Sequence, residues 1–245
     1  MTALGFLYPG HSAEDDYPRI EQLIGSDVRL DLVHTDIGED AHRVDALREM
    51  GSPARLAAGV EELRLSGAEA VVWACTSGSF VYGWEGAHEQ VRALARAAGL
   101  PASSASFAFA HAVREIGARR VAIAATYPQD VADLFAAFLR EAGVEVVSTR
   151  ASGIVTAAEV GTWGEAEILA VARAGDRPDA DADAVLVPDT ALHTAAHLPA
   201  LEEALSKPVL TANQVTVWEA LRLAGRKVNA PTLGTLFSKA PIIQA

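Results

Sequence analysis

The chain has 245 residues, of which 50% are hydrophobic, and its formal net charge is −12 at pH 7. This length and composition are sufficient for one large core or two smaller ones. The acidic charge and the lack of a basic cluster interleaved with aromatic residues argue against a nucleic-acid partner. Apolar runs fall short of the roughly 20 residues of a membrane span, and no basic region precedes the first of them. We therefore expect a cytoplasmic protein without a membrane partner.

Short apolar runs typical of strands alternate with amphipathic helical patterns along the chain. The strand-like runs cover residues 4–9, 28–36, 68–77, 119–128, 144–153, 182–190 and 207–213. Apolar residues at helical spacing mark 52–67 and 130–143, and each of these segments ends at a glycine typical of a helix C-terminus. The alternation predicts an α/β protein with parallel sheets covered by helices.

The order of signals in the first half of the chain recurs in the second half. The corresponding pairs are Pro9 and Pro128, Cys75 and Asp189, and Pro101 and Pro208. We expect two pseudo-symmetric, Rossmann-like halves, residues 1–108 and 109–230. Each half would hold a short parallel sheet flanked by helices, with an active-site cleft between the halves. We expect residues 231–245 to form a tail that packs back on the first half.

The only cysteine of the chain, Cys75, ends an apolar run and is followed by "TSGS". A strand that turns into a helix here leaves N–H groups unpaired, and such groups bind anions and lower the pKa of a nearby thiol. Ligands bind beyond the carboxyl ends of parallel strands, so Cys75 and Asp189 are expected to face each other across the cleft as the catalytic residues. The candidate substrate-binding residues at the same strand ends are Pro9, Gly10, Thr76, Ser77, Tyr127 and Thr190.

Each of these features also has a structural explanation. A free cysteine is commonly a buried core residue, and an Asp before a Thr commonly caps a helix. His193 and His197 have i, i+4 spacing but lack the Glu and third ligand of a zinc site, so a solvated helix face is expected. His11 and His34 lie near strand ends, where they either line the cleft or are structural. We expect no metal and no organic cofactor, and the sequence has no dinucleotide-binding or Walker-type loop.

Together these motifs resemble the aspartate/glutamate racemase superfamily, in the branch that contains arylmalonate decarboxylase and maleate cis-trans isomerase. The resemblance rests on "YPG" at 8–10, "GAEAVVWACTSGSFVYG" at 67–83, "GLPASSASFAFAHAVREIGARRVAIAATYPQDV" at 99–131 and "VTVWEALRLAG" at 215–225. It implies two Rossmann-like halves, no cofactor, and chemistry at the carbon next to a carboxylate through an enolate.

The resemblance also implies roles for individual residues. Thr76, Ser77 and Tyr127 match positions whose hydroxyl and amide groups hold the enediolate in the decarboxylase. Cys75 matches the first cysteine of the racemases and maleate isomerases, where the decarboxylase has glycine. Asp189 stands where all three enzymes carry their second cysteine, so the chain departs from the two-thiol mechanism of the racemases.

These patterns favour a cofactor-independent isomerase that acts on a small carboxylate or dicarboxylate, with Cys75 as nucleophile or acid/base. One alternative is a lyase similar to arylmalonate decarboxylase, in which Cys75 donates the proton. Another is a non-catalytic carboxylate-binding protein that has lost the second cysteine. Redox sensing has less support because the chain contains no resolving cysteine. Exposed helical faces of such folds commonly support homo-oligomers.

Overall fold

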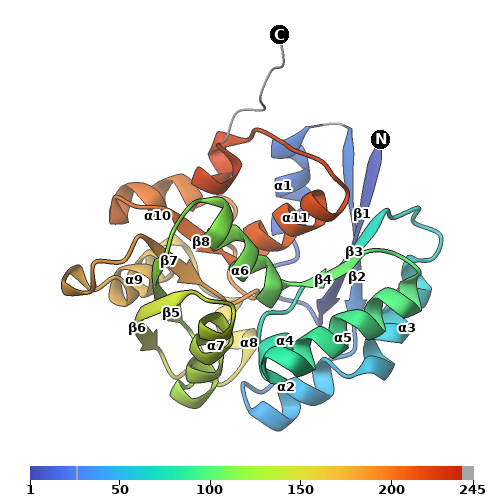
Figure 1. Ribbon diagram of the computed structural model, residues 1–245, viewed down its shortest axis with the longest axis horizontal. Helices are drawn as coiled ribbons and strands as arrows, with labels where there is room; N and C mark the ends of the chain where they lie inside the picture. Colours follow the sequence, from blue (N-terminus) through green and yellow to red (C-terminus); the bar gives the residue numbers. More distant parts are fainter. Residues whose placement is uncertain (26, 239–245) are drawn as a thin grey trace.

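The computed structural model describes residues 1–25 and 27–238, and within these ranges the strands form two parallel sheets (Figure 1). The first sheet has the order β2-β1-β3-β4, with β1 at Thr2–Pro9, β2 at Val28–Thr35, β3 at Ala70–Trp73 and β4 at Ala102–Ser104. The second has the order β6-β5-β7-β8, with β5 at Arg120–Ala125, β6 at Glu145–Ala151, β7 at Ala184–Val187 and β8 at Val209–Thr211. The predicted fold class is confirmed, because both sheets are parallel and repeat one strand order.

Helices flank both sheets and connect successive strands. In the first half they are α1 (Asp16–Ile24), α2 (Val44–Met50), α3 (Pro53–Leu63), α4 (Ser77–Phe80), α5 (Gly83–Ala98) and α6 (Ala105–Glu115). In the second half they are α7 (Gln129–Glu141), α8 (Ala157–Val160), α9 (Glu165–Gly175), α10 (Leu198–Leu205) and α11 (Ala212–Leu223). Three short 3₁₀ helices complete the described chain: η1 (Pro178–Ala180), η2 (Pro231–Leu233) and η3 (Thr235–Phe237). No helix in the described ranges has the length and hydropathy of a membrane span.

The central strands are buried on both faces, as expected of parallel sheets between helix layers. All four residues of β3 and of β7 are buried, whereas the edge strands β2 and β6 are partly exposed. Cys75 and Asp189 therefore each lie two residues after a fully buried strand, β3 and β7. The carboxyl ends of these strands carry the site described below.

Helix α11 lies against the first half of the chain, where it contacts α1, α6 and strands β1, β3 and β4. Its fully buried Glu219 accepts hydrogen bonds from Ser103 at 2.7 Å and from Arg222 at 2.8 Å, and its oxygen lies 3.0 Å from a His111 ring nitrogen. Burial alone would raise the pKa of Glu219, but the bonds from Arg222 and His111 outweigh it and lower the pKa to about 2. A buried ionised carboxylate thus joins α11 to α6 and β4.

The segment after α11 reaches both halves of the molecule. Helix η2 packs against α1 of the first half and against α10 of the second. The predicted tail covers residues 231–245, of which 239–245 lie outside the described residues.

Candidate functional site

A cavity of about 50 Å³ lies where the carboxyl ends of β1, β3 and β7 meet the loops that follow them. Six of the predicted site residues line it: Pro9, Gly10, Cys75, Ser77, Asp189 and Thr190. The rest of the wall comes from loops and short helices whose part in the site the sequence did not indicate: Ser12, Ile37, Asp40, His42, Leu47, Met50, Ala157, Ala158 and Ala191. His11, expected either to line the cleft or to be structural, also lines it. Both halves therefore contribute to one site.

Cys75 stands between the end of β3 and the start of α4, and it is only 2% exposed. Its sulfur accepts a hydrogen bond from the backbone N–H of Gly78 at 3.2 Å and lies 3.7 Å from the hydroxyl of Ser77. Burial raises the pKa of the thiol to about 11, against the lowering effect of those two bonds, and the negative charge of Asp189 adds to the rise. The loop N–H groups lower this pKa as expected, but burial outweighs them, so the net shift is upward and the expected low pKa is not found. At neutral pH Cys75 carries its proton.

Asp189 follows β7 and lines the same cavity, and it is 3% exposed. One carboxylate oxygen accepts a hydrogen bond from the backbone N–H of Ala191 at 2.9 Å, and the other accepts one from the hydroxyl of Thr126. The next helix, α10, begins only at Leu198, so Asp189 does not cap it. These two bonds fix the carboxylate, and its charge acts on the thiol of Cys75.

Two predicted substrate-binding residues, Thr76 and Tyr127, lie behind the cavity wall rather than on it. The Thr76 side chain is fully buried, and its hydroxyl has no hydrogen-bond partner among the described residues. Tyr127 is 1% exposed and donates its hydroxyl hydrogen to the carbonyl of Pro188 at 2.9 Å. Burial, with the nearby charges of Asp189 and Cys75, raises the pKa of Tyr127 well above its usual value. The structure places both hydroxyls next to the site but not in contact with its open space.

The loop between β2 and α2 joins the two halves over the cavity. The carboxylate of Asp40 accepts hydrogen bonds from the N–H groups of Ala157 at 2.8 Å and Ala158 at 3.0 Å. The N–H of His42 donates to the carbonyl of Val155 at 2.8 Å. Both Asp40 and His42 line the cavity. In the sequence, this loop was recognisable only as a polar segment directly after a strand. The contacts of the loop with the second half could not be inferred from that pattern.

A second set of bonds fixes the loop that carries Thr190. Asp16, at the start of α1, is 1% exposed and accepts hydrogen bonds from the N–H groups of Thr194 at 3.0 Å and Ala195 at 3.1 Å. Burial raises the pKa of Asp16, although the bond from the Asn213 amide opposes this. Asn213 also donates to the carbonyl of Thr190 at 3.2 Å. The first half thus holds the loop that follows Asp189.

The histidines singled out in the sequence make local contacts. His193 and His197 precede α10 instead of forming a helix face, and the His193 ring lies 2.6 Å from a carboxylate oxygen of Asp15. His11, Glu14 and His34 place one potential ligand atom each within 4.8 Å of one another, as in a metal site. However, the rings of His11 and His34 are stacked at 3.9 Å with an interplanar angle of 30°. A metal lies near the plane of each imidazole that binds it, so stacked rings do not direct their nitrogens at one ion, and we assign no metal here.

The chain is similar in sequence to two enzymes of known activity. It is 32% identical over 178 residues to the arylmalonate decarboxylase of Bordetella bronchiseptica. These aligned residues cover 72% of this chain and 74% of that protein. It is 25% identical over 138 residues to the maleate isomerase of Geobacillus stearothermophilus, over 56% of this chain and 55% of that protein. The stronger of these matches is with the decarboxylase.

Solved structures of both kinds of enzyme share the fold. A liganded arylmalonate decarboxylase variant, with one glycine changed to cysteine and one cysteine to serine, superposes with a TM-score of 0.84 at 26% identity, over 98% of this chain and all of that one. A Cys-to-Ala variant of the maleate isomerase of Pseudomonas putida S16 with maleate superposes with a TM-score of 0.87 at 20% identity, over 98% of each chain. The family model described as arylmalonate decarboxylase matches residues 52–237. The chain therefore belongs to the arylmalonate decarboxylase family.

Proposed function

We propose that the chain is a cofactor-independent decarboxylase of 2-substituted malonates, in which the thiol of Cys75 donates the proton. The observation that carries this proposal is a buried thiol that lines one small cavity together with a buried carboxylate, with the pKa of the thiol raised by burial. A decarboxylase must deliver one proton to the carbon from which carbon dioxide has left, and a thiol with a pKa of about 11 retains its proton at neutral pH. Family membership supports the same class of chemistry.

The proposed reaction needs only groups of this chain. One carboxylate of the substrate binds at the Cys75 loop, where the hydroxyl of Ser77 lines the cavity. The bond from the α carbon to the other carboxylate breaks, carbon dioxide leaves, and the electron pair forms an enediolate that local hydrogen-bond donors stabilise. Cys75 transfers its proton to the α carbon, and the resulting thiolate regains a proton from water. The net change is the uptake of one proton and the loss of one carbon dioxide.

Asp189 takes a supporting role in this scheme. Its charge raises the pKa of Cys75, so it favours the thiol over the thiolate. The hydrogen bonds that it accepts from Ala191 and Thr126 hold it in place in the cavity wall. In this proposal the second catalytic position retains an electrostatic function without a second thiol.

The isomerase alternative, which the sequence favours, keeps one supporting observation: the chain is 25% identical over 138 residues to a maleate isomerase. Addition to a double bond needs the thiolate, which is the nucleophilic form of cysteine. With a pKa of about 11, only about one thiol in 10⁴ is ionised at pH 7. The raised pKa of the buried thiol therefore favours proton donation over nucleophilic addition.

A panel of substrates in D₂O, followed by proton NMR, tests the proposal. With 2-methylmalonate we expect loss of carbon dioxide and one deuterium at the α carbon of the product. Conversion of maleate to fumarate without decarboxylation of any malonate would assign the isomerase reading instead. Shifts of ligand signals without turnover of any compound would assign the carboxylate-binding reading.

A further inference from the structure

The cavity wall has carboxylates but few groups that can offset a negative substrate. The described residues that line it include Asp40 and Asp189, and none of them is Lys or Arg. A malonate brings two further negative charges into this space, and a buried charge without a partner is costly. In the described part of the wall, only the imidazoles of His11 and His42 can become positively charged. The proposed substrate therefore needs one of these two histidines.

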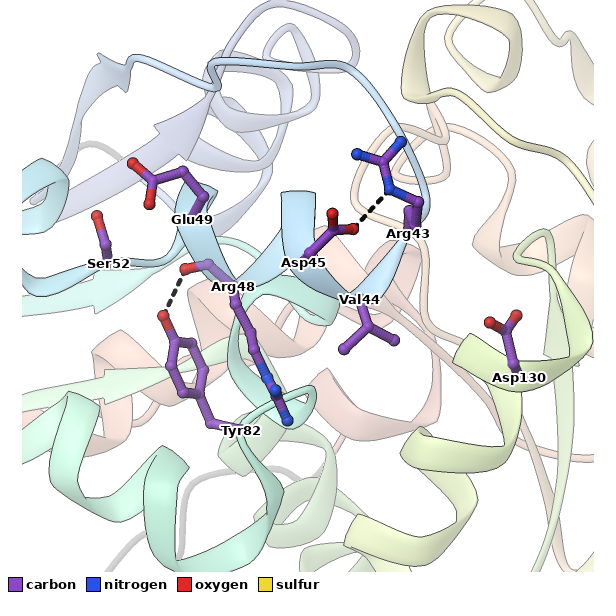
Figure 2. A pocket seen from close by; sticks show the side chains of 8 residues that line it. All are labelled: Arg43, Val44, Asp45, Arg48, Glu49, Ser52, Tyr82 and Asp130. Carbon is purple, nitrogen blue, oxygen red and sulfur yellow. Dashed lines mark hydrogen bonds and ion pairs between the residues drawn. The ribbon is translucent and has the colours of Figure 1, made fainter.

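His11 is poorly placed to offset a charge inside the cavity. Its side chain is 72% exposed, so solvent screens its charge, and its Nδ1 lies 3.1 Å from a carboxylate oxygen of Glu14. Arg43, the cation that follows His42 in the chain, does not line the cavity. It lines a separate hollow beside α2 and pairs with Asp45 at 2.6 Å (Figure 2). His42 is therefore the candidate that remains.

Two hydrogen bonds to the second half of the chain hold His42 in the wall, and the residue is only 8% exposed. Its backbone N–H donates to the carbonyl of Val155 at 2.8 Å, and its Nδ1 lies 2.9 Å from the carbonyl oxygen of Ile154. A carbonyl oxygen only accepts, so Nδ1 carries a hydrogen and donates it. The edge of the Tyr127 ring system meets the imidazole at 85°, with ring centroids 5.1 Å apart. These contacts fix the tautomer of His42 and limit its rotation.

The other ring nitrogen of His42, Nε2, has no hydrogen-bond partner among the described residues. Because Nδ1 already carries a hydrogen, Nε2 is an acceptor in the neutral ring and an N–H donor in the cationic ring. A carboxylate only accepts, so it can bond to Nε2 only when the ring is protonated. His42 can therefore bind a carboxylate in its charged form alone.

We infer that protonated His42, together with the Ser77 hydroxyl, binds the carboxylate that the substrate retains and stabilises the enediolate formed from it. Both residues line the same cavity of about 50 Å³, so one small ligand reaches both. When carbon dioxide leaves, the electron pair of the broken bond moves onto the retained carboxylate and increases its negative charge. A cationic donor therefore binds the transition state more strongly than the substrate. This inference rests on the proposed decarboxylation and adds a binding residue to that same site.

Carboxylate binding by His42 must depend on pH, because only the protonated ring donates from Nε2. Histidine side chains change charge between about pH 5 and 8, whereas the thiol of Cys75, with a pKa of about 11, keeps its proton over that range. The affinity for a carboxylate should therefore fall as the pH rises. The other titratable or charged groups that line the cavity or lie next to His42 are His11, Asp40, Tyr127, Asp189 and Arg43. Substitution of His42 separates its contribution from theirs.

The test measures the dissociation constant of propionate, the product expected from 2-methylmalonate, at about pH 5.5 and about pH 8.5 by NMR titration of backbone amide signals. It compares the wild type with His42→Asn, whose side-chain amide can replace the Nδ1 bond to Ile154, and with His42→Gln as a second neutral variant. Arg43→Gln is the matched control, because it removes a neighbouring cation that lies outside the cavity. Propionate binding needs no turnover, so the result does not depend on decarboxylation.

We expect the wild type and Arg43→Gln to bind propionate about tenfold or more tightly at the lower pH, and both His42 variants to bind it equally weakly at the two pH values. In the wild type, kcat/KM for 2-methylmalonate should fall over the same range. Equal affinity at both pH values, no binding of propionate, or a pH dependence that persists without His42 would overturn its role. Binding with the expected pH dependence, but without decarboxylation of any malonate, would overturn the proposed function and retain His42 as the residue that binds a carboxylate.

Discussion

Replacement of Cys75 with alanine is expected to lower kcat for decarboxylation by roughly 10²–10⁴-fold, the contribution typical of a positioned proton donor. The described part of the cavity wall holds no second thiol, and the carboxylate of Asp189 is held by hydrogen bonds from Ala191 and Thr126. The enediolate would then be protonated only by solvent that enters the cavity. The rate of 2-methylmalonate loss, followed by proton NMR, measures the effect.

A Cys75→Ser variant separates acidity from shape. Serine keeps an atom that can accept the hydrogen bond of Gly78, but its hydroxyl is a far weaker acid than the thiol. We expect Cys75→Ser to be folded, with an unchanged circular dichroism spectrum, and to be nearly as slow as Cys75→Ala. Wild-type rates in either variant would show that Cys75 is not the proton donor.

Replacement of Gly51 with alanine is expected to destabilise the fold by about 1–3 kcal/mol, the cost of overpacking a tight contact. The new Cβ would lie 2.1 Å from the carbonyl oxygen of Gly78 and 2.7 Å from the amide nitrogen of Gln90. Because the obstacle is backbone, α2 must move away from the Cys75 loop, and Met50 moves with it. Urea unfolding measures the free energy of unfolding, and kcat/KM for 2-methylmalonate should fall as well.

The control for this substitution is Gly164→Ala at the start of α9. A Cβ atom there meets only the carboxylate of Glu167 at 3.6 Å, an ordinary contact, and the backbone dihedral φ of −98° suits any residue. Because Gly164 is the N-cap of α9, where alanine is less favourable than glycine, the free energy of unfolding of this variant should fall slightly, but by less than that of Gly51→Ala. Equal stability of Gly51→Ala and Gly164→Ala would show that α2 is not held against the Cys75 loop as described.

The fold and the two catalytic candidates could be predicted because they depend on local pattern. Apolar runs separated by amphipathic helices identify parallel strands, and the carboxyl ends of such strands lie at one edge of a sheet. The internal correspondence of Cys75 with Asp189 then brings both residues to one cavity. Pro9, Gly10, Ser77 and Thr190 reach the same cavity for the same reason.

The rest of the site depends on contacts between distant segments. Thr76 neighbours two cavity residues, yet the turn into α4 directs its side chain into the interior, which the sequence alone did not reveal. The end of α2 reaches Cys75, with the sulfur of Met50 3.9 Å from that of Cys75, because Gly51 lies against Gly78. The pKa of Cys75 depends on how much solvent these contacts exclude, so the direction of its shift could not be predicted from the loop residues alone.

The protonation state of Cys75 also affects stability at high pH. The pKa of the thiol in the folded state, about 11, lies above its ordinary value of 9.0. The unfolded chain therefore loses this proton first as the pH rises. The associated stability is fully present below pH 9 and is lost as the pH rises toward 11. Carboxylates with lowered pKa values, such as Glu219, have the opposite dependence and lose their contribution in acid.

A pH titration of Cys75 tests the central claim most directly. Because the chain has one cysteine, the thiolate absorbance of the wild type minus that of Cys75→Ala reports this thiol alone. We expect no thiolate at neutral pH, as a proton donor requires, and a midpoint near pH 11. A thiol that is already ionised at pH 7 would contradict it, and would assign Cys75 the role of a nucleophile.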